Sequence, residues 1–218
     1  MGIAAAMAEP KGSRRSRRMP PAIRPLRRGF FVRDPRRVAR ELLGKVLVRQ
    51  EKGLHLTARI VEVEAYLGEK DPASHSFVGP TLRNAVLFGP PGYAYIYFIY
   101  GNHYCLNVSC LPVGNPGGVL FRAIEPLEGV KTMARLRVVP ESSSAFRISG
   151  GPGRLCQALG ITVAHSGLPL DRPPFALHAR VGRADVVSGL RIGITKAVDL
   201  PWRYGLRGSR YLSKPFES

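Results

Sequence analysis

The feature that most constrains the fold is a run of β-prone residues broken by a single Gly-Asn pair, YAYIYFIYGNHYCLN at residues 93–107. Tyrosine, isoleucine and phenylalanine are enriched in strands. A Gly-Asn pair between two such runs is typical of a tight turn. The pattern predicts a β-hairpin with strands at 93–100 and 103–110, and it places Tyr100 at the hairpin tip.

The remaining sequence mixes strand and helix signals without a βαβ alternation, which predicts an α+β fold. Asp34 and Pro35 predict a helix start, and Gly44 predicts its end. Asp71-Pro72 repeats this helix-start pattern, and a helix is expected over 126–137, with Pro126 near its start. Strands are expected over 45–50, 54–66, 117–126 and 190–195.

The chain of 218 residues is long enough for one folded domain with a sizeable core. Residues 1–28 are rich in Arg, Pro, Ser and Ala and have no apolar periodicity, so we expect a disordered basic arm. Residues 29–218 are expected to form the domain. The three cysteines, Cys105, Cys110 and Cys156, form no CxxC pair, so buried reduced thiols are expected.

The charge balance points to a polyanionic partner. The chain holds 33 Lys and Arg against 15 Asp and Glu, a net charge of +18. Residues 1–30 supply eight of these cations and one Glu, so most of the excess lies in the predicted domain. Such a surface suits DNA, RNA or an anionic membrane. No apolar run is long enough to span a bilayer, and the first residues lack the order of a secretory signal, so we expect a cytoplasmic protein.

The strand RIVEVEAY, residues 59–66, combines carboxylates with an aromatic residue. Period-2 alternation places Glu62, Glu64 and Tyr66 on one face, together with Ile60, and turns Val61, Val63 and Ala65 to the core. The two carboxylates could simply face solvent. A Tyr row on a basic protein also suits stacking on nucleobases.

An aromatic residue at the hairpin tip is a candidate wedge. Tyr100 could enter a base stack in place of an extruded nucleotide, or it could fold back on its own hairpin. A carboxylate near the flipped base could direct water at a glycosidic bond. The five histidines and three cysteines lack metal-binding spacing, so we expect no metal and no cofactor.

Four motifs in order resemble the alkyladenine (3-methyladenine) DNA glycosylases: RIVEVEAYLGEKDPASHS, RNAVLFGPPGYAYIYFIYGNHYCLNVSC, GGVLFRAIEPLEG and GGPGRLCQALGI. The similarity runs from about residue 31 to 213 and is thin across 161–190. It implies a single domain with a curved, mainly antiparallel sheet, a protruding hairpin and surrounding helices. The segment SFVGPTLRN, residues 76–84, departs from relatives that have more Gly and Arg there.

The resemblance implies a role for each matching residue of the base pocket. Glu64 would activate the water that attacks C1′ of the sugar. Tyr66 and Tyr97 would stack on the flipped base. His75 would line the pocket and offer its backbone amide to the base edge. Asn107 would disfavour the exocyclic amino group of normal guanine.

Two further positions would contact DNA by the same resemblance. Tyr100 would be the intercalating wedge, and Arg122 would lie beside the water and the DNA backbone. The implied activity is hydrolytic removal of alkylated or deaminated purines (3-methyladenine, 7-methylguanine, hypoxanthine and ethenoadenine) from double-stranded DNA. A water nucleophile predicts no strand-cleaving lyase step.

Two other interpretations stay open from the residues alone. A non-catalytic nucleic-acid-binding module would share the charge and the aromatic residues, but it has no need of Glu64. An RNA-modifying enzyme is separated from a DNA enzyme only by the family resemblance. A monomer suffices to flip one base, and we expect it in the nucleoid of a bacterium or the nucleus of a eukaryote.

Overall fold

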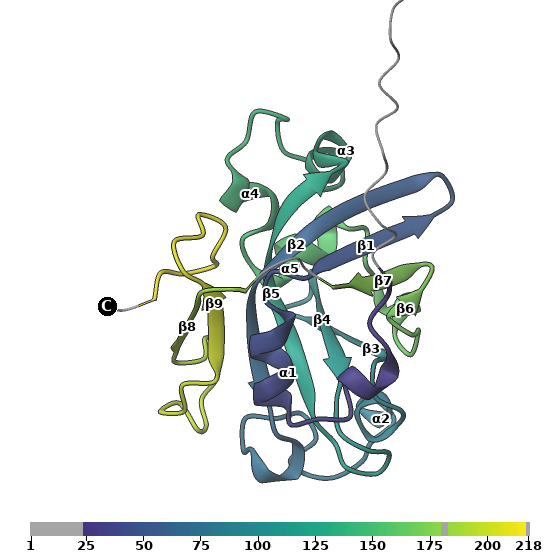
Figure 1. The fold of residues 1–218 in the computed structure, drawn as a ribbon, viewed down its shortest axis with the longest axis vertical. Coiled ribbons are helices and arrows are strands. Elements are labelled where there is room, and N and C mark those ends of the chain that lie inside the picture. The colour runs from purple at the N-terminus through teal and green to yellow at the C-terminus, as the bar shows by residue number, and fades with distance from the viewer. Residues whose placement is uncertain (1–23, 180–182, 217–218) are drawn as a thin grey trace, which may run out of the picture.

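A computed structural model describes residues 24–179 and 183–216. Its strands form one curved antiparallel sheet with the order β3-β4-β5-β2-β1-β7-β6, and β9 pairs with both β2 and β8. Helices surround this sheet within the described residues, which confirms the predicted α+β class (Figure 1). The strands are β1 (Val46–Glu51), β2 (Leu54–Tyr66), β3 (Ala94–Ile99), β4 (His103–Ser109), β5 (Gly118–Glu128), β6 (Asp171–Arg172), β7 (Phe175–His178), β8 (Val186–Gly189) and β9 (Arg203–Leu206).

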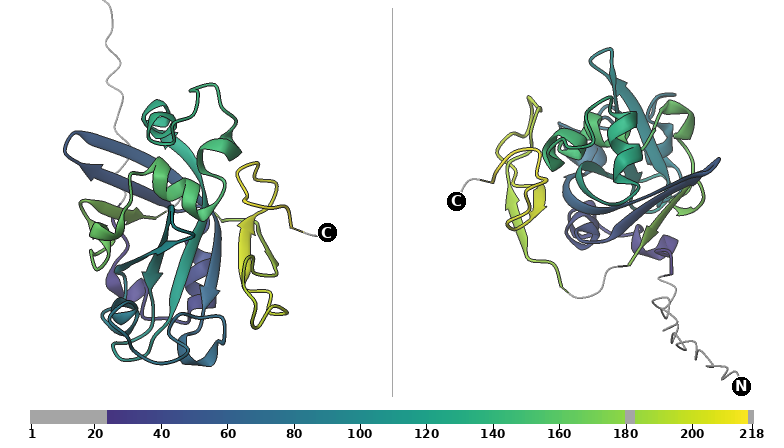
Figure 2. Two further views of the ribbon diagram at one scale, coloured as in Figure 1. Left: turned by 180° about the vertical axis from the view of Figure 1, so that it is seen from behind. Right: turned by 90° about the horizontal axis from the view of Figure 1, so that it is seen from above.

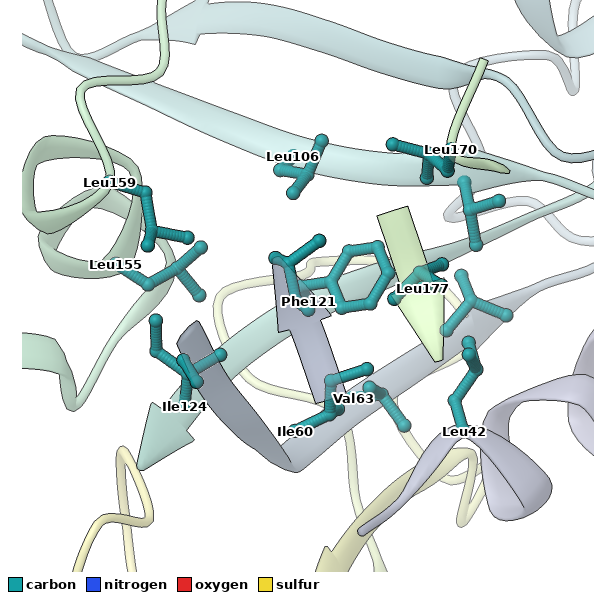
Figure 3. Close-up of a cluster of buried hydrophobic side chains, with 14 of the residues drawn as sticks. Leu42, Ile60, Val63, Leu106, Phe121, Ile124, Leu155, Leu159, Leu170 and Leu177 are labelled. Carbon is teal, nitrogen blue, oxygen red and sulfur yellow. The ribbon is translucent and has the colours of Figure 1, made fainter. Parts of the chain in front are cut away.

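The helices cover the sheet and close the hydrophobic core. They are α1 (Pro35–Leu42), α2 (Ala85–Phe88), α3 (Val130–Leu136), α4 (Ala145–Ser149) and α5 (Pro152–Ala158), with short 3₁₀ turns η1 (Arg28–Phe30), η2 (Gly68–Lys70) and η3 (Val163–His165). Helix α1 packs on β2 and β5, and α5 packs on β4 and β5. Buried Leu42 of α1, Phe121 of β5 and Leu155 of α5 meet in one apolar cluster (Figure 3).

The predicted hairpin is formed by β3 and β4, which pair in register from Ala94↔Val108 to Ile99↔His103. It projects from the body of the protein (Figure 2, right). The turn is centred one residue earlier than the Gly-Asn prediction, because the Asn102 amide donates to the Ile99 carbonyl at 3.4 Å. Tyr100 and Gly101 are the central residues, and both have positive φ, 54° and 71°. Both central residues of a type I′ turn need this left-handed conformation.

A β-bulge at Val61 changes the predicted faces of β2. Across the β2–β5 ladder Ile60 pairs with Ile124, whereas Glu62 pairs with the adjacent Ala123, so one residue of β2 has no partner. The alternation is therefore interrupted between 60 and 62. Ile60 joins Val63 in the core, contrary to the predicted pattern, and Val61 is buried outside that cluster. From Glu62 to Tyr66 the predicted alternation holds.

Three local predictions were wrong. Residues 71–77 form turns instead of a helix, and 190–195 form a bent loop instead of a strand. Pro126 lies within β5, and the following helix begins at Val130. A buried ion pair between Asp71 and Arg191 joins the first two segments, and pairing with β2 extends β5 past Pro126.

The first helix and the basic arm complete the comparison. Helix α1 begins as predicted, since the Asp34 carboxylate accepts from the Arg36 amide at 2.8 Å. Residues 1–23 of the predicted arm lie outside the described residues. Its last residues pack on the domain: the Leu26 amide donates to the Leu177 carbonyl at 2.7 Å, and Leu26 is buried. The disorder of the arm stays a prediction.

Candidate active site

Glu64 lies near the end of β2 and is fully buried. Its Oε2 accepts a hydrogen bond from the Tyr66 hydroxyl at 2.8 Å, and its Oε1 accepts from the backbone amide of Ile192 at 2.8 Å. Arg122 Nη1 lies 3.3 Å from Oε1. A buried carboxylate is costly unless it is paired and hydrogen-bonded, and these donors meet that requirement. The solvent-facing alternative for Glu64 is therefore excluded.

Glu62 is also fully buried and shares Arg122 with Glu64. Its Oε1 lies 3.4 Å from Arg122 Nε and accepts from Arg203 Nη1 at 2.9 Å and the Ser213 hydroxyl at 2.8 Å. Burial acts to lower the pKa of Arg122, but the two carboxylates outweigh it and raise that pKa. The carboxylates of Glu62 and Glu64 and the guanidiniums of Arg122 and Arg203 thus form one buried cluster of opposite charges.

A cleft of about 530 Å³ opens beside this cluster. Every predicted pocket and DNA-contact residue lines it: Tyr66, His75, Tyr97, Tyr100, Asn107 and Arg122. Glu64 is not part of the lining surface, because it lies behind Tyr66 and Arg122, with which it is in contact. The structure therefore brings together residues from four separate parts of the chain. Their individual roles remain predictions.

Aromatic rings form one wall of the cleft. The His75 ring lies 4.4 Å from the Tyr97 ring, centroid to centroid, at 66°. Tyr95, which the sequence analysis did not select, lines the same cleft and lies 2.9 Å, through its hydroxyl, from His75 Nδ1. Burial, with the charge of Arg83 adding to it, lowers the pKa of His75, so the ring is neutral at pH 7.

The hydroxyls of Tyr66, Tyr95 and Tyr97 are protonated at neutral pH. Burial raises the pKa of Tyr95 to about 12 and raises the pKa values of Tyr66 and Tyr97 as well. Each phenol can therefore donate a hydrogen bond. Asn107 is held by its own donor, since Nδ2 donates to the Tyr95 carbonyl at 3.1 Å.

Tyr100 is 78% exposed at the hairpin tip, so it does not fold back on its hairpin. The tip is attached to the neighbouring loop, because Arg83 Nη2 donates to the Phe98 carbonyl at 3.1 Å. Arg83 also lies over the Tyr97 ring at 5.7 Å. The exposed ring thus sits at the rim of the cleft on a fixed support.

The second wall is the loop that follows β8, which the sequence analysis expected to be a strand. Arg191 in this loop forms a buried bidentate ion pair with Asp71, at 2.5 and 2.9 Å. Its guanidinium lies 4.7 Å from the Tyr66 ring and 5.0 Å from the Trp202 ring. This anchoring presents the Ile192 amide to Glu64. No local sequence signal identifies a pair of residues 120 positions apart.

Other expectations concern metals, thiols and membranes. Cys105, Cys110 and Cys156 are free and buried, as predicted. Cys105 lines the cleft, and burial raises the pKa of its thiol, so it is a neutral group. Across the described parts of the chain no cluster of three or more His, Cys, Asp or Glu could hold a metal ion. None of the helices described is both long and apolar enough to cross a bilayer.

Known proteins resemble this chain over most of its length. The profile of the family described as Methylpurine-DNA glycosylase (MPG) matches residues 29–210. A Rhodopseudomonas palustris (strain HaA2) protein is 53% identical over 193 residues, covering 88% of this chain and 92% of its own. A Koribacter versatilis protein is 56% identical over 193 residues, covering 87% and 93%. A Bradyrhizobium diazoefficiens protein is 51% identical over 202 residues, covering 92% and 97%.

All three relatives are named, by inference, 3-methyladenine DNA glycosylases. The family match spans most of the chain and includes every residue that lines the cleft. The function of such a protein is base excision repair, and its substrate is DNA. The chain belongs to the methylpurine-DNA glycosylase family.

Proposed function

We propose that this glycosylase flips alkylated and deaminated purines out of duplex DNA and hydrolyses their N-glycosidic bond with a water directed by Glu64. The observation that carries the proposal is the buried Glu64 carboxylate at the inner end of an aromatic cleft. An ionised carboxylate accepts about four hydrogen bonds. Tyr66, Ile192 and Arg122 account for three of them, which leaves one acceptor position for a water.

The charge of Glu64 would serve the reaction in two ways. A carboxylate within hydrogen-bond reach can take the proton of the attacking water. Its negative charge also stabilises the oxocarbenium-like sugar that forms as the base leaves. The Arg122 guanidinium and the Ile192 amide would hold the carboxylate in position through this step, since both contact Oε1.

The aromatic walls support a preference for purines that carry positive charge. A cationic ring such as 3-methyladenine is attracted to the faces of Tyr66 and Tyr97. His75 is neutral and does not repel such a ring. Asn107, held by the Tyr95 carbonyl, would disfavour the exocyclic amino group of guanine. The proposed substrates are 3-methyladenine and 7-methylguanine, whose rings are cationic, and hypoxanthine and ethenoadenine, which are neutral but lack the 2-amino group of guanine.

Tyr100 would fill the gap that the flipped nucleotide leaves in the duplex. An inserted apolar wedge compensates part of the lost stacking and keeps the duplex kinked. A monomer would suffice for this reaction, since only one base is flipped. The relatives are bacterial proteins, and we place this enzyme on the bacterial chromosome.

We further propose that the enzyme has no lyase step. A lyase forms a covalent imine between an amine and the sugar, and Lys196 is the amine that lines the cleft. Its ammonium lies 6.0 Å from the Phe77 ring. Borohydride reduction during turnover should trap no protein–DNA adduct. An adduct that disappears in Lys196→Ala would overturn this part of the proposal.

The central test is single-turnover excision from duplexes that carry one hypoxanthine or one ethenoadenine, and from methylated DNA. Glu64→Gln should lower the rate at least about 100-fold, in the range that positioned acid–base groups contribute. The matched control is Glu69→Gln, the same change at an exposed position five residues along, which should excise at the wild-type rate. A Glu64→Gln enzyme of near wild-type rate would refute the assignment.

Two results would favour the other interpretations. Tight binding of damaged duplex without base release by the wild type would indicate a lesion-binding module. Release of modified bases from RNA but not from DNA of the same sequence would indicate an RNA enzyme.

A further inference from the structure

A second cavity, of about 340 Å³, lies between α1 and the start of β9. These two elements lie side by side (Figure 1). The cavity shares no lining residue with the cleft. Its walls include Asp34, Arg36, Arg37 and Arg40 from α1 and its cap, with Trp202 and Tyr204 opposite. The excision mechanism uses none of these residues.

Tyr204 carries a hydroxyl that lacks a partner in the cavity wall. Its side chain is fully buried, and no hydrogen-bond partner for the hydroxyl exists among the residues described. The charges that act on it most strongly are those of Arg40, Arg36 and Asp34, all of which line the cavity. Burial raises the pKa of Tyr204, so the hydroxyl is a donor at neutral pH. Buried donors in native proteins almost always have an acceptor.

The arginines supply positive charge to the cavity wall. Arg36 is paired with Asp34 at 2.7 Å, and Arg37 is paired with Glu41 at 3.1 Å. Arg40 has no ion pair or hydrogen bond within the described residues. Its guanidinium instead lies 4.8 Å from the Tyr204 ring. An uncompensated guanidinium thus covers the ring whose hydroxyl lacks an acceptor.

We propose that this cavity binds a phosphate group, held by the Arg40 guanidinium and the Tyr204 hydroxyl. A phosphate offers several strong acceptors, and guanidinium groups match its geometry with two parallel hydrogen bonds. Asp34 would repel an anion, but Arg36 and its amide hold that carboxylate. The phosphate could belong to the backbone of a second DNA segment or to a free phosphate compound, since both present the same chemistry.

Trp202 provides a direct assay. It is the only tryptophan of the chain and it lines the cavity, with the Arg36 guanidinium 5.5 Å from its ring. Sodium phosphate or tripolyphosphate, added at constant ionic strength, should change its fluorescence with saturation. Chloride should produce no saturable change. The absence of a saturable phosphate response in the wild type would overturn the proposal.

Two variants test the assigned groups. Arg40→Gln and Tyr204→Phe should each raise the half-saturating phosphate concentration by about tenfold, as expected for a lost charge-assisted hydrogen bond. Arg135→Gln is the matched control, because Arg135 is also an exposed arginine in the last turn of a helix. Arg40→Gln and Arg135→Gln with equal half-saturation would refute the site. Tyr204→Phe preserves the ring, and so keeps the test informative if Arg40→Gln perturbs α1.

A duplex titration then identifies the source of the phosphate. If undamaged duplex binds Arg40→Gln more weakly than Arg135→Gln, the cavity takes a phosphate of the DNA backbone. If both variants bind duplex equally while the phosphate response differs, the ligand is a free phosphate compound. Neither residue lines the excision cleft, so failure here leaves the proposed excision activity unaffected.

Discussion

The strongest stability prediction concerns the buried pair between Arg191 and Asp71. Both side chains are fully buried, and the guanidinium makes two short contacts, at 2.5 and 2.9 Å, with the carboxylate. Arg191→Met preserves the approximate length of the side chain but leaves Asp71 as an uncompensated buried charge. Removing one partner of such a pair costs about 3–5 kcal/mol. That is a large share of the roughly 5–15 kcal/mol that stabilises a typical domain.

The assay is urea denaturation followed by circular dichroism, with Arg207→Met as the matched control. Arg207 forms an ion pair of similar length, 3.1 Å, with Asp185, but these side chains are 64% and 69% exposed. An exposed pair contributes about 0–1 kcal/mol, so the control should lose little stability. If Arg191→Met loses no more stability than Arg207→Met, the reasoning is refuted.

The double variant Asp71→Asn/Arg191→Met separates loss of charge pairing from loss of packing. Removing both charges should recover at least about 2 kcal/mol relative to Arg191→Met, because the buried charge is gone. Excision should remain impaired in the double variant, since Arg191 also positions the loop whose Ile192 amide contacts Glu64. Full recovery of excision would show that Arg191 has no positioning role.

Tyr100→Gly should be about 1 kcal/mol more stable than Tyr100→Ala, because the position needs positive φ. Equal melting temperatures of the two variants would contradict this stability difference. Both variants should lose excision from paired DNA. Glu62→Gln should lower the free energy of unfolding by about 3 kcal/mol, because buried Arg203 loses its carboxylate partner. The control Glu125→Gln, at a more exposed ion pair, should lower it by less than about 1 kcal/mol. Similar losses of both variants in urea denaturation would argue against this prediction. Burial lowers the pKa of His75 below its ordinary 6.5. The unfolded chain therefore binds the proton more readily than the folded protein. The contribution of neutral His75 to stability is lost as the pH falls below 6.5 towards the lower pKa of the folded state. In denaturant titrations, the free energy of unfolding should therefore fall less in His75→Gln than in the wild type as the pH is lowered from 7.5 to below 6.5. If it falls equally in both proteins, another group titrates in this pH range.

Much of the site could be predicted from sequence because its residues lie in short local patterns. The two-residue period of RIVEVEAY places Glu64 and Tyr66 on one face; Tyr66 lines the cleft, and Glu64 lies behind it in contact with its hydroxyl. The break between two β-prone runs predicted the hairpin and placed Tyr100 at its tip, where the structure exposes it. These signals depend on strand pleat and turn chemistry, which a few neighbouring residues determine.

The tertiary structure decided what surrounds those residues. A bulge at Val61 interrupts the alternation, and Glu62 and Glu64 are both buried beneath segments distant in sequence: the Ile192 amide contacts Glu64, and the Ser213 hydroxyl contacts Glu62. Arg122 reaches both carboxylates only because β5 lies beside β2.

The conformation of the loop that follows β8 is likewise decided by contacts between residues distant in sequence. Its LRIGIT sequence predicts a strand, but Arg191 instead pairs with Asp71, 120 positions earlier, and stacks against Tyr66. Local propensity amounts to less than about 1 kcal/mol per residue, whereas a buried ion pair imposes several kcal/mol on any conformation that breaks it. The sequence by itself therefore determined which residues of these short motifs lie at or directly behind the cleft, and only the assembled sheet decided how their charges are buried and balanced.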